Sequence, residues 1–120
     1  MTLFGRLSSW APTDAEMKNG FVASPSDIGN LQHRVLSQLE GEQIVCSHPR
    51  EVQTLENADA VYFVISEMSI CSTAYQELVL AVFVKTEQSH RWLVRLDDTE
   101  IPEGFFMLRS LPEQNFGRKS

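Results

Sequence analysis

The chain has 120 residues, 42% of them hydrophobic, and a formal net charge of −6 from 16 acidic and 10 basic residues. This length suits one domain with a single hydrophobic core, and the hydrophobic content is far above that of disordered chains. The excess of negative charge repels phosphate, and only Arg118 and Lys119 place two basic side chains together. Nucleic-acid and membrane partners are therefore disfavoured.

Two cysteines, Cys46 and Cys71, are too few for a disulfide scaffold, and the first residues lack the apolar core of a secretory signal. We therefore expect a cytoplasmic protein with reduced thiols. Residues 1–18 predict an N-terminal appendage, 19–112 the domain and 113–120 a polar tail. Four apolar residues of the appendage have helical spacing and would pack on the domain or on a partner: Leu3, Phe4, Leu7 and Trp10.

The first half of the domain alternates strands with helical segments. Residues 20–24 predict a strand that ends at the turn sequence Ser-Pro-Ser-Asp, and Ser26 or Asp27 would cap the following helix. This helix places five apolar residues on one face, Ile28, Leu31, Val35, Leu36 and Leu39. Residues 43–46 predict a second strand, and Pro49 would begin one or two helical turns that reach about Asn57.

The second half is centred on residues 59–66, whose continuous apolar run is typical of a strand that is covered on both faces. The next apolar segment, 73–86, is ambiguous. Its β-branched residues favour a strand, whereas its length and a cap at Ser72 favour a buried helix, which we predict. Residues 91–96 predict another strand, and 105–108 a last one.

Strands that alternate with helices pair in parallel, because a parallel crossover is long enough to hold a helix. We therefore expect an α/β fold, a three-layer sandwich with a mainly parallel sheet of four or five strands. Ligands of such sheets bind beyond the carboxyl ends of the strands. In this chain those ends are 24–27, 46–50, 66–72 and 97–100.

The signatures of most nucleotide and metal sites are absent from the sequence. It contains no Walker loop, no dinucleotide glycine pattern and no nucleophile elbow. His33, His48 and His90 are too far apart for a zinc motif, so we predict no metal site. His48 is still of interest because it lies on the expected ligand edge.

Glu77 is the carboxylate that we single out for chemistry. It lies about a turn and a half into the predicted helix, slightly too deep to serve only the helix dipole. Its sequence neighbours are apolar, so partial desolvation of its carboxylate is expected, a condition common at active sites. The alternative is an ordinary glutamate on the surface of a helix.

Three stretches resemble the second half of a Toll/interleukin receptor (TIR) domain of the bacterial kind. They are DAVYFVIS at 59–66, STAYQELVLA at 72–81 and RWLVRLDDTEIPEGF at 91–105. A looser similarity, in GFVAS-PSD and QLEGEQI, extends the resemblance to about 20–108.

The resemblance implies a flavodoxin-like sheet and, for enzymatic members, cleavage of the nicotinamide–ribose bond of NAD⁺, which is substrate rather than cofactor. Glu77 then matches the essential glutamate, which would stabilise an oxocarbenium-like cation and hold the ribose hydroxyls. The candidate substrate-binding residues are the polar side chains of the ligand edge: Ser24, Ser26, Asp27, His48, Ser66, Ser72 and Tyr75.

The sequence also departs from the TIR pattern. The loop at 23–26 lacks an aromatic or basic residue, and the loop after the second strand shrinks to 46–50. Thr73-Ala74 replaces a frequent Trp-Cys pair, and no final helix is evident after Leu111.

These departures leave a second hypothesis, a TIR-like interaction module that self-associates or binds a partner TIR or sensor domain. A third is an enzyme similar to nucleoside deoxyribosyltransferases, suggested by Ala58-Asp59 before the strand and by the glutamate on the next helix.

Overall fold

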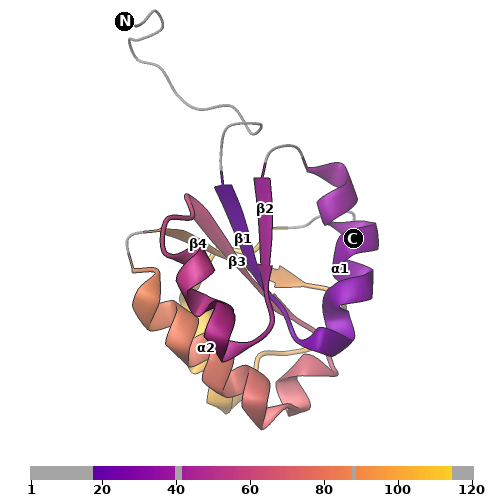
Figure 1. Cartoon of the computed structure of the whole chain (residues 1–120). Helices are drawn as coiled ribbons and strands as arrows, with labels where there is room; N and C mark the ends of the chain where they lie inside the picture. Colours follow the sequence, from indigo (N-terminus) through magenta and orange to yellow (C-terminus); the bar gives the residue numbers. More distant parts are fainter. Residues whose placement is uncertain (1–17, 40–41, 88, 115–120) are drawn as a thin grey trace, which may run out of the picture.

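The structure is a computed structural model that describes residues 18–39, 42–87 and 89–114 (Figure 1). Four parallel strands form one sheet in the order β2-β1-β3-β4. The strands are β1 (Lys18–Val22), β2 (Glu42–Cys46), β3 (Ala60–Ile65) and β4 (His90–Arg95). The α-helices are α1 (Ile28–Arg34) and α2 (Thr73–Lys85). Helices lie on both faces of the sheet, so the predicted flavodoxin-like α/β sandwich is confirmed.

Five 3₁₀ segments complete the described structure: η2 (Pro25–Asp27), η3 (Leu36–Gln38), η4 (Pro49–Leu55), η5 (Ser69–Cys71) and η6 (Glu103–Ser110). The helical turns expected from Pro49 are therefore present, as η4. The N-terminal appendage lies outside the described residues except for Lys18, which begins β1. The part of the chain that the structure describes holds no helix long and apolar enough to span a membrane.

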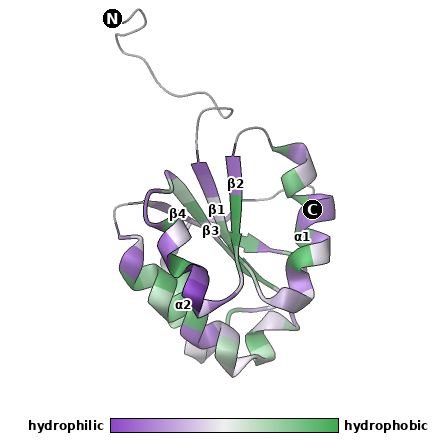
Figure 2. Ribbon diagram, viewed as in Figure 1, coloured by the Kyte–Doolittle hydropathy of each residue, from purple (hydrophilic) through white to green (hydrophobic). Residues whose placement is uncertain are grey.

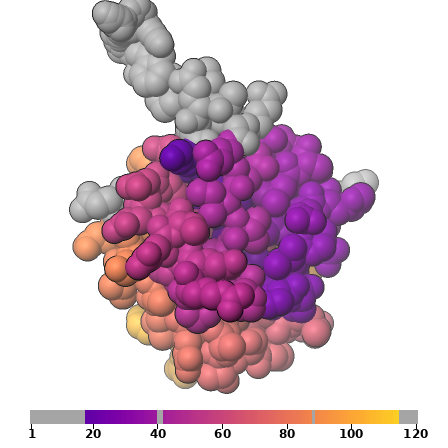
Figure 3. Space-filling view, viewed as in Figure 1, coloured from indigo at the N-terminus to yellow at the C-terminus, as the bar shows by residue number. Residues whose placement is uncertain are grey.

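The central strand β3 supplies side chains to both faces of the sheet. Val61, Phe63 and Ile65 point to the face covered by α2, η4 and η6, whereas Tyr62 and Val64 point to the face covered by α1 and η3. This alternation explains why its sequence is apolar throughout. Figure 2 shows the apolar residues along β3 and α2, and Figure 3 shows η4, in magenta, adjoining the orange surface of α2.

The ambiguous segment 73–86 is a helix, as predicted. The hydroxyl of Ser72 accepts a hydrogen bond from the backbone N–H of Tyr75 at 3.1 Å and so caps the first turn. Leu78, Val79 and Val82 are buried against the sheet, and their burial overrides the β-propensity of the segment.

The helix predicted from Ile28 is shorter than expected. It ends at Arg34, and η3 continues the chain as a separate turn. At this end the Ser37 hydroxyl donates to the carbonyl of His33 at 2.8 Å, and the Gln38 side chain donates to the carbonyl of Arg34 at 2.6 Å. Such side-chain bonds compete with the regular backbone ladder of a helix.

The last predicted strand, 105–108, is wrong, because these residues lie in η6. Phe105 and Leu108 are both buried, three residues apart, which is the spacing that places side chains on one face of a 3₁₀ helix. A shorter pairing occurs further on, where Leu93 N–H donates to Pro112 O and Gln114 N–H donates to Leu93 O, each at 2.8 Å. Glu113 and Gln114, the first two residues of the predicted polar tail, take part in this pairing.

Gly20 tests how closely η4 packs on β1. A Cβ at this position would lie 2.4 Å from Cδ2 of the buried Leu55, so we expect Gly20→Ala to lower the free energy of unfolding by about 1–3 kcal/mol. Gly29→Ala is the matched control, because no atom lies within 4 Å of its Cβ and alanine favours the helix by about 1 kcal/mol. Urea unfolding of both variants measures the two shifts, and equal shifts would contradict the packing.

Candidate functional site

The predicted ligand edge brings together residues from two loops at the carboxyl ends of the strands. Asp27 follows β1, Ser66 follows β3, and Ser69 lies in η5, and all three side chains are buried. The Ser66 hydroxyl lies 2.8 Å from each carboxylate oxygen of Asp27, to which it donates. The structure therefore brings two predicted site residues, 39 positions apart, into direct contact.

Ser69 completes this buried polar cluster, which comprises Asp27, Ser66 and Ser69. The backbone N–H of Ser66 donates to the Ser69 hydroxyl at 2.8 Å, and the Ser69 N–H donates back to the Ser66 hydroxyl at 3.2 Å. These reciprocal bonds hold the turn after β3 in place. Asp27 and Ser66 thus have partners within the protein and do not project into solvent.

Asp27 occupies the position before α1 without capping it. Its carboxylate is directed to Ser66, and no side-chain bond to the helix is formed. The capping role predicted for Ser26 or Asp27 is therefore wrong. Ser24 instead caps η2 by accepting from the Ser26 N–H at 3.3 Å, and the Ser24 and Ser26 hydroxyls bond each other at 2.8 Å.

Burial raises the pKa of the Asp27 carboxyl above its ordinary value. The Ser66 hydroxyl opposes this shift because it stabilises the carboxylate, and the negative charge of Asp97 adds to it. Asp97 accepts backbone N–H bonds from Glu67 at 3.0 Å and Thr99 at 3.1 Å. The Ser66 hydroxyl thus stabilises the charged form of Asp27, whereas burial and the charge of Asp97 destabilise it.

Tyr75 serves the fold at this edge. Its side chain is only 2% exposed, and its hydroxyl donates to the carbonyl of Val22 at 2.7 Å and also contacts the carbonyl of Val64. The bond therefore ties α2 to the ends of β1 and β3. Burial raises the pKa of the phenol well above its usual value, so the hydroxyl stays a donor.

Three predicted site residues meet at a cavity of about 150 Å³: His48, Ser72 and Tyr75. The remaining lining residues are Pro25, Ser47, Pro49 and Ala74. The cavity thus lies between the loops after β1 and β2 and the first turn of α2. Its volume is below the roughly 300–1,000 Å³ of most small-molecule sites.

The groups beside this cavity are poorly suited to nucleophilic chemistry. Burial raises the pKa of the Cys46 thiol to about 11, so the sulfur stays protonated near neutral pH. Backbone N–H bonds from Ser47 at 3.0 Å and His48 at 3.2 Å lower the pKa of the Glu51 carboxyl. Glu51 is therefore an ionised carboxylate that fixes the loop after β2.

Glu77 lies on the outer surface of α2. Its side chain is exposed, so the partial desolvation expected from its apolar sequence neighbours is not found. Leu78 and Val79, which follow it, are buried, whereas Glu77 points to solvent, because successive residues of a helix face different directions. Glu77 does not line the cavity at the ligand edge.

Sequence reasoning missed two features of the site. Ser69 lies inside the loop 66–72 that was expected at the ligand edge, but a serine in a polar loop carries no signal of burial. The polar residues also divide into a buried cluster and a separate cavity, and this division depends on the directions of the side chains.

The described residues contain no group of three or more histidine, cysteine or acidic side chains that would hold a metal ion.

The parallel sheet, the helices on its two faces and a ligand edge whose polar side chains bond one another define a small flavodoxin-like α/β domain. No protein-family model and no curated protein matches the sequence. A crystal structure of a pilus assembly-related protein from Burkholderia pseudomallei is similar, with a TM-score of 0.53 and 14% sequence identity. The match covers 88% of this chain and 81% of the other, and it shows a shared fold.

The raised pKa of Asp27 predicts how pH affects stability. The folded state binds this proton more tightly than the unfolded chain does, so the contribution of Asp27 is full below about pH 4 and is lost as pH rises through the folded-state pKa. The Asp27→Asn variant has no titratable group at this position, so it does not lose this stability as the pH rises. We therefore expect its unfolding free energy, relative to wild type, to increase as the pH is raised from 4 to 8 in urea titrations.

Ser66→Ala is the control, because it keeps the carboxylate but removes its donor. It should lower stability by about 1.5–3 kcal/mol at neutral pH, and less in acid. Parallel stability curves for wild type and Asp27→Asn across this range would contradict the assignment.

Proposed function

We propose that this protein is a non-catalytic, TIR-like interaction module that works by self-association. The observation that carries the proposal is the apolar outer face of α2, where Leu80 is 43% exposed and Val84 is 74% exposed. We call Leu80, Ala81 and Val84 the α2 face. The three lie on one side of the helix because residues three and four positions apart are neighbours on its surface.

A second copy of the chain is the proposed occupant of the α2 face. One helix face can pack on the same face of another copy around a two-fold axis, which is the commonest symmetry of soluble oligomers. Exposed apolar residues that are adjacent on a helix gain from such contact, because association removes their surface from water. The resemblance to TIR domains supports this choice, since assembly is central to that family.

The ligand edge supports an interaction role over NAD⁺ cleavage. A substrate with two nucleotides needs a larger cavity than about 150 Å³, and the polar side chains nearby are engaged with one another. Glu77 is exposed, where water would weaken its stabilisation of a developing cation. Hydrolysis of NAD⁺ at Glu77 and deoxyribosyl transfer are the alternatives.

Self-association is tested at Val84. We expect Val84→Asp to shift the protein toward monomer in sedimentation-velocity runs over a range of concentrations, because each two-fold contact would bury two carboxylates. Gln32→Asp is the matched control, an exposed residue of α1 on the opposite layer. The same mass distribution for wild type and Val84→Asp would refute the assignment of this face.

The enzymatic alternative is tested by nicotinamide release. We expect wild type at high concentration to leave NAD⁺ intact, alone or on a surface that promotes assembly, and Glu77→Ala to behave identically. Turnover by wild type that is lost in Glu77→Ala would overturn the non-catalytic proposal and identify the glutamate as catalytic.

A further inference from the structure

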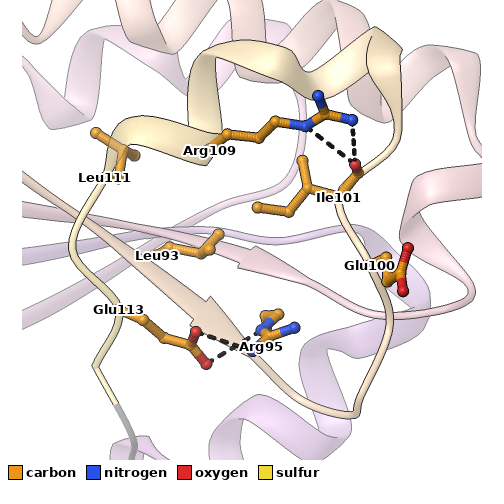
Figure 4. Close-up of a pocket in the computed structure, with 7 residues that line it drawn as sticks. All are labelled: Leu93, Arg95, Glu100, Ile101, Arg109, Leu111 and Glu113. Carbon is orange, nitrogen blue, oxygen red and sulfur yellow. Dashed lines mark hydrogen bonds and ion pairs between the residues drawn. The ribbon is translucent and has the colours of Figure 1, made fainter.

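An open groove of about 420 Å³ lies at the β4 edge of the sheet. We call it the β4 groove. Figure 4 shows its apolar floor, formed by Leu93 of β4, Ile101 of the loop after it, and Leu111 beyond η6. Arg109 lies along one rim and the Arg95–Glu113 pair along the other, with Glu100 at the end. The volume is within the range of ligand-binding sites.

The two arginines of the groove differ in their partners. Arg95 is neutralised by Glu113, with an ion pair at 3.0 Å and a second bond from Nε at 3.1 Å. Arg109 donates from Nε at 3.3 Å and from Nη2 at 2.9 Å to the carbonyl oxygen of Ile101. In the described part of the chain Arg109 forms no ion pair, so its charge is not balanced by a carboxylate.

The bonds to Ile101 also orient the guanidinium of Arg109. A guanidinium has five N–H donors, and one carbonyl engages the edge formed by Nε and Nη2. The Nη1 side remains able to bind a carboxylate, with two parallel hydrogen bonds as the favoured geometry. An oriented cation thus stands beside an apolar floor in a protein whose net charge is −6.

We propose that the β4 groove binds a peptide of a partner protein that presents an apolar side chain next to a carboxylate. The apolar side chain packs on Leu93, Ile101 and Leu111, and the carboxylate pairs with Arg109. Glu100 disfavours an additional negative charge at its end of the groove, and Figure 4 shows its carboxylate turned away from Arg109. This inference rests on the proposed interaction role and names the chemistry of a partner distinct from a second copy.

An extended peptide suits the groove better than a small molecule does. The groove is open to solvent beside β4, and the outer edge of β4 is already paired at Leu93 with residues 112–114, so a peptide adds no strand to the sheet. An extended chain can instead lie in the groove, with alternate side chains directed to its apolar floor. The carboxylate can be a chain terminus or an acidic side chain. The two sources share one chemistry, so the probes below separate them.

Three acetylated peptides test the proposal by amide shift changes in ¹⁵N-labelled protein. The probes are Gly-Val-Leu with a free carboxylate, the same peptide as a terminal amide, and Gly-Leu-Glu as a terminal amide. We expect a carboxylate probe to shift Leu93, Ile101 and Leu111, and the uncharged amide to leave them unchanged. Binding of the first identifies a chain terminus as the ligand, and binding of the third an acidic side chain.

Arg109→Gln should weaken binding by about tenfold or more, because it removes a charged hydrogen-bonding partner. Arg109→Lys keeps the charge and should retain part of the affinity. Arg50→Gln is the matched control, since it removes one exposed positive charge on η4, away from the groove.

Equal weakening by Arg50→Gln and Arg109→Gln, or no shift at the three floor residues with any carboxylate probe, would overturn the groove assignment. Thermal melts confirm that each variant is folded. Sedimentation of the Val84→Asp variant reports separately on self-association, so failure of the groove is distinguishable from failure of the interaction role.

Discussion

The central strand β3 can be stable only if both of its faces are covered, and this constraint organises the domain. Its alternate side chains enter two separate cores, one beneath α2, η4 and η6 and the other beneath α1 and η3. The hydroxyl of Tyr75 ties the larger layer to the ends of β1 and β3 by bonding the carbonyls of Val22 and Val64. The same bond positions the first turn of α2 over the ligand edge.

This arrangement has a consequence for function. In an open parallel sheet, the carboxyl ends of the strands are where ligands usually bind. Here the side chains at that edge serve the fold, because Asp27 and Ser66 bond each other and Ser69 bonds the turn after β3. Two other surface features lie away from this edge, on the outer face of α2 and at the β4 edge. We propose both as surfaces for contact with other protein chains.

How far the sequence predicts this structure can be judged from particular elements. The continuous apolar run of 59–66 identified the central strand, and the Ser72 cap and the length of 73–86 identified α2 despite its β-branched residues. The segment 105–108 was misassigned because two phenylalanines and a leucine suit a strand as well as a 3₁₀ helix. Phe105 and Leu108 are both buried in the core beneath η6, and this three-residue spacing of buried side chains depends on the tertiary structure.

By itself, the sequence determined the α/β class, the parallel pairing and the segments that meet at the carboxyl edge, because these follow from the local alternation of strands and helices. Only the tertiary structure decided what the residues of that edge do. Whether Asp27 faces solvent or Ser66, and whether Tyr75 lines a site or joins two strands, depends on contacts between residues up to 53 positions apart. No local pattern encodes such contacts, since they form only when the layers pack.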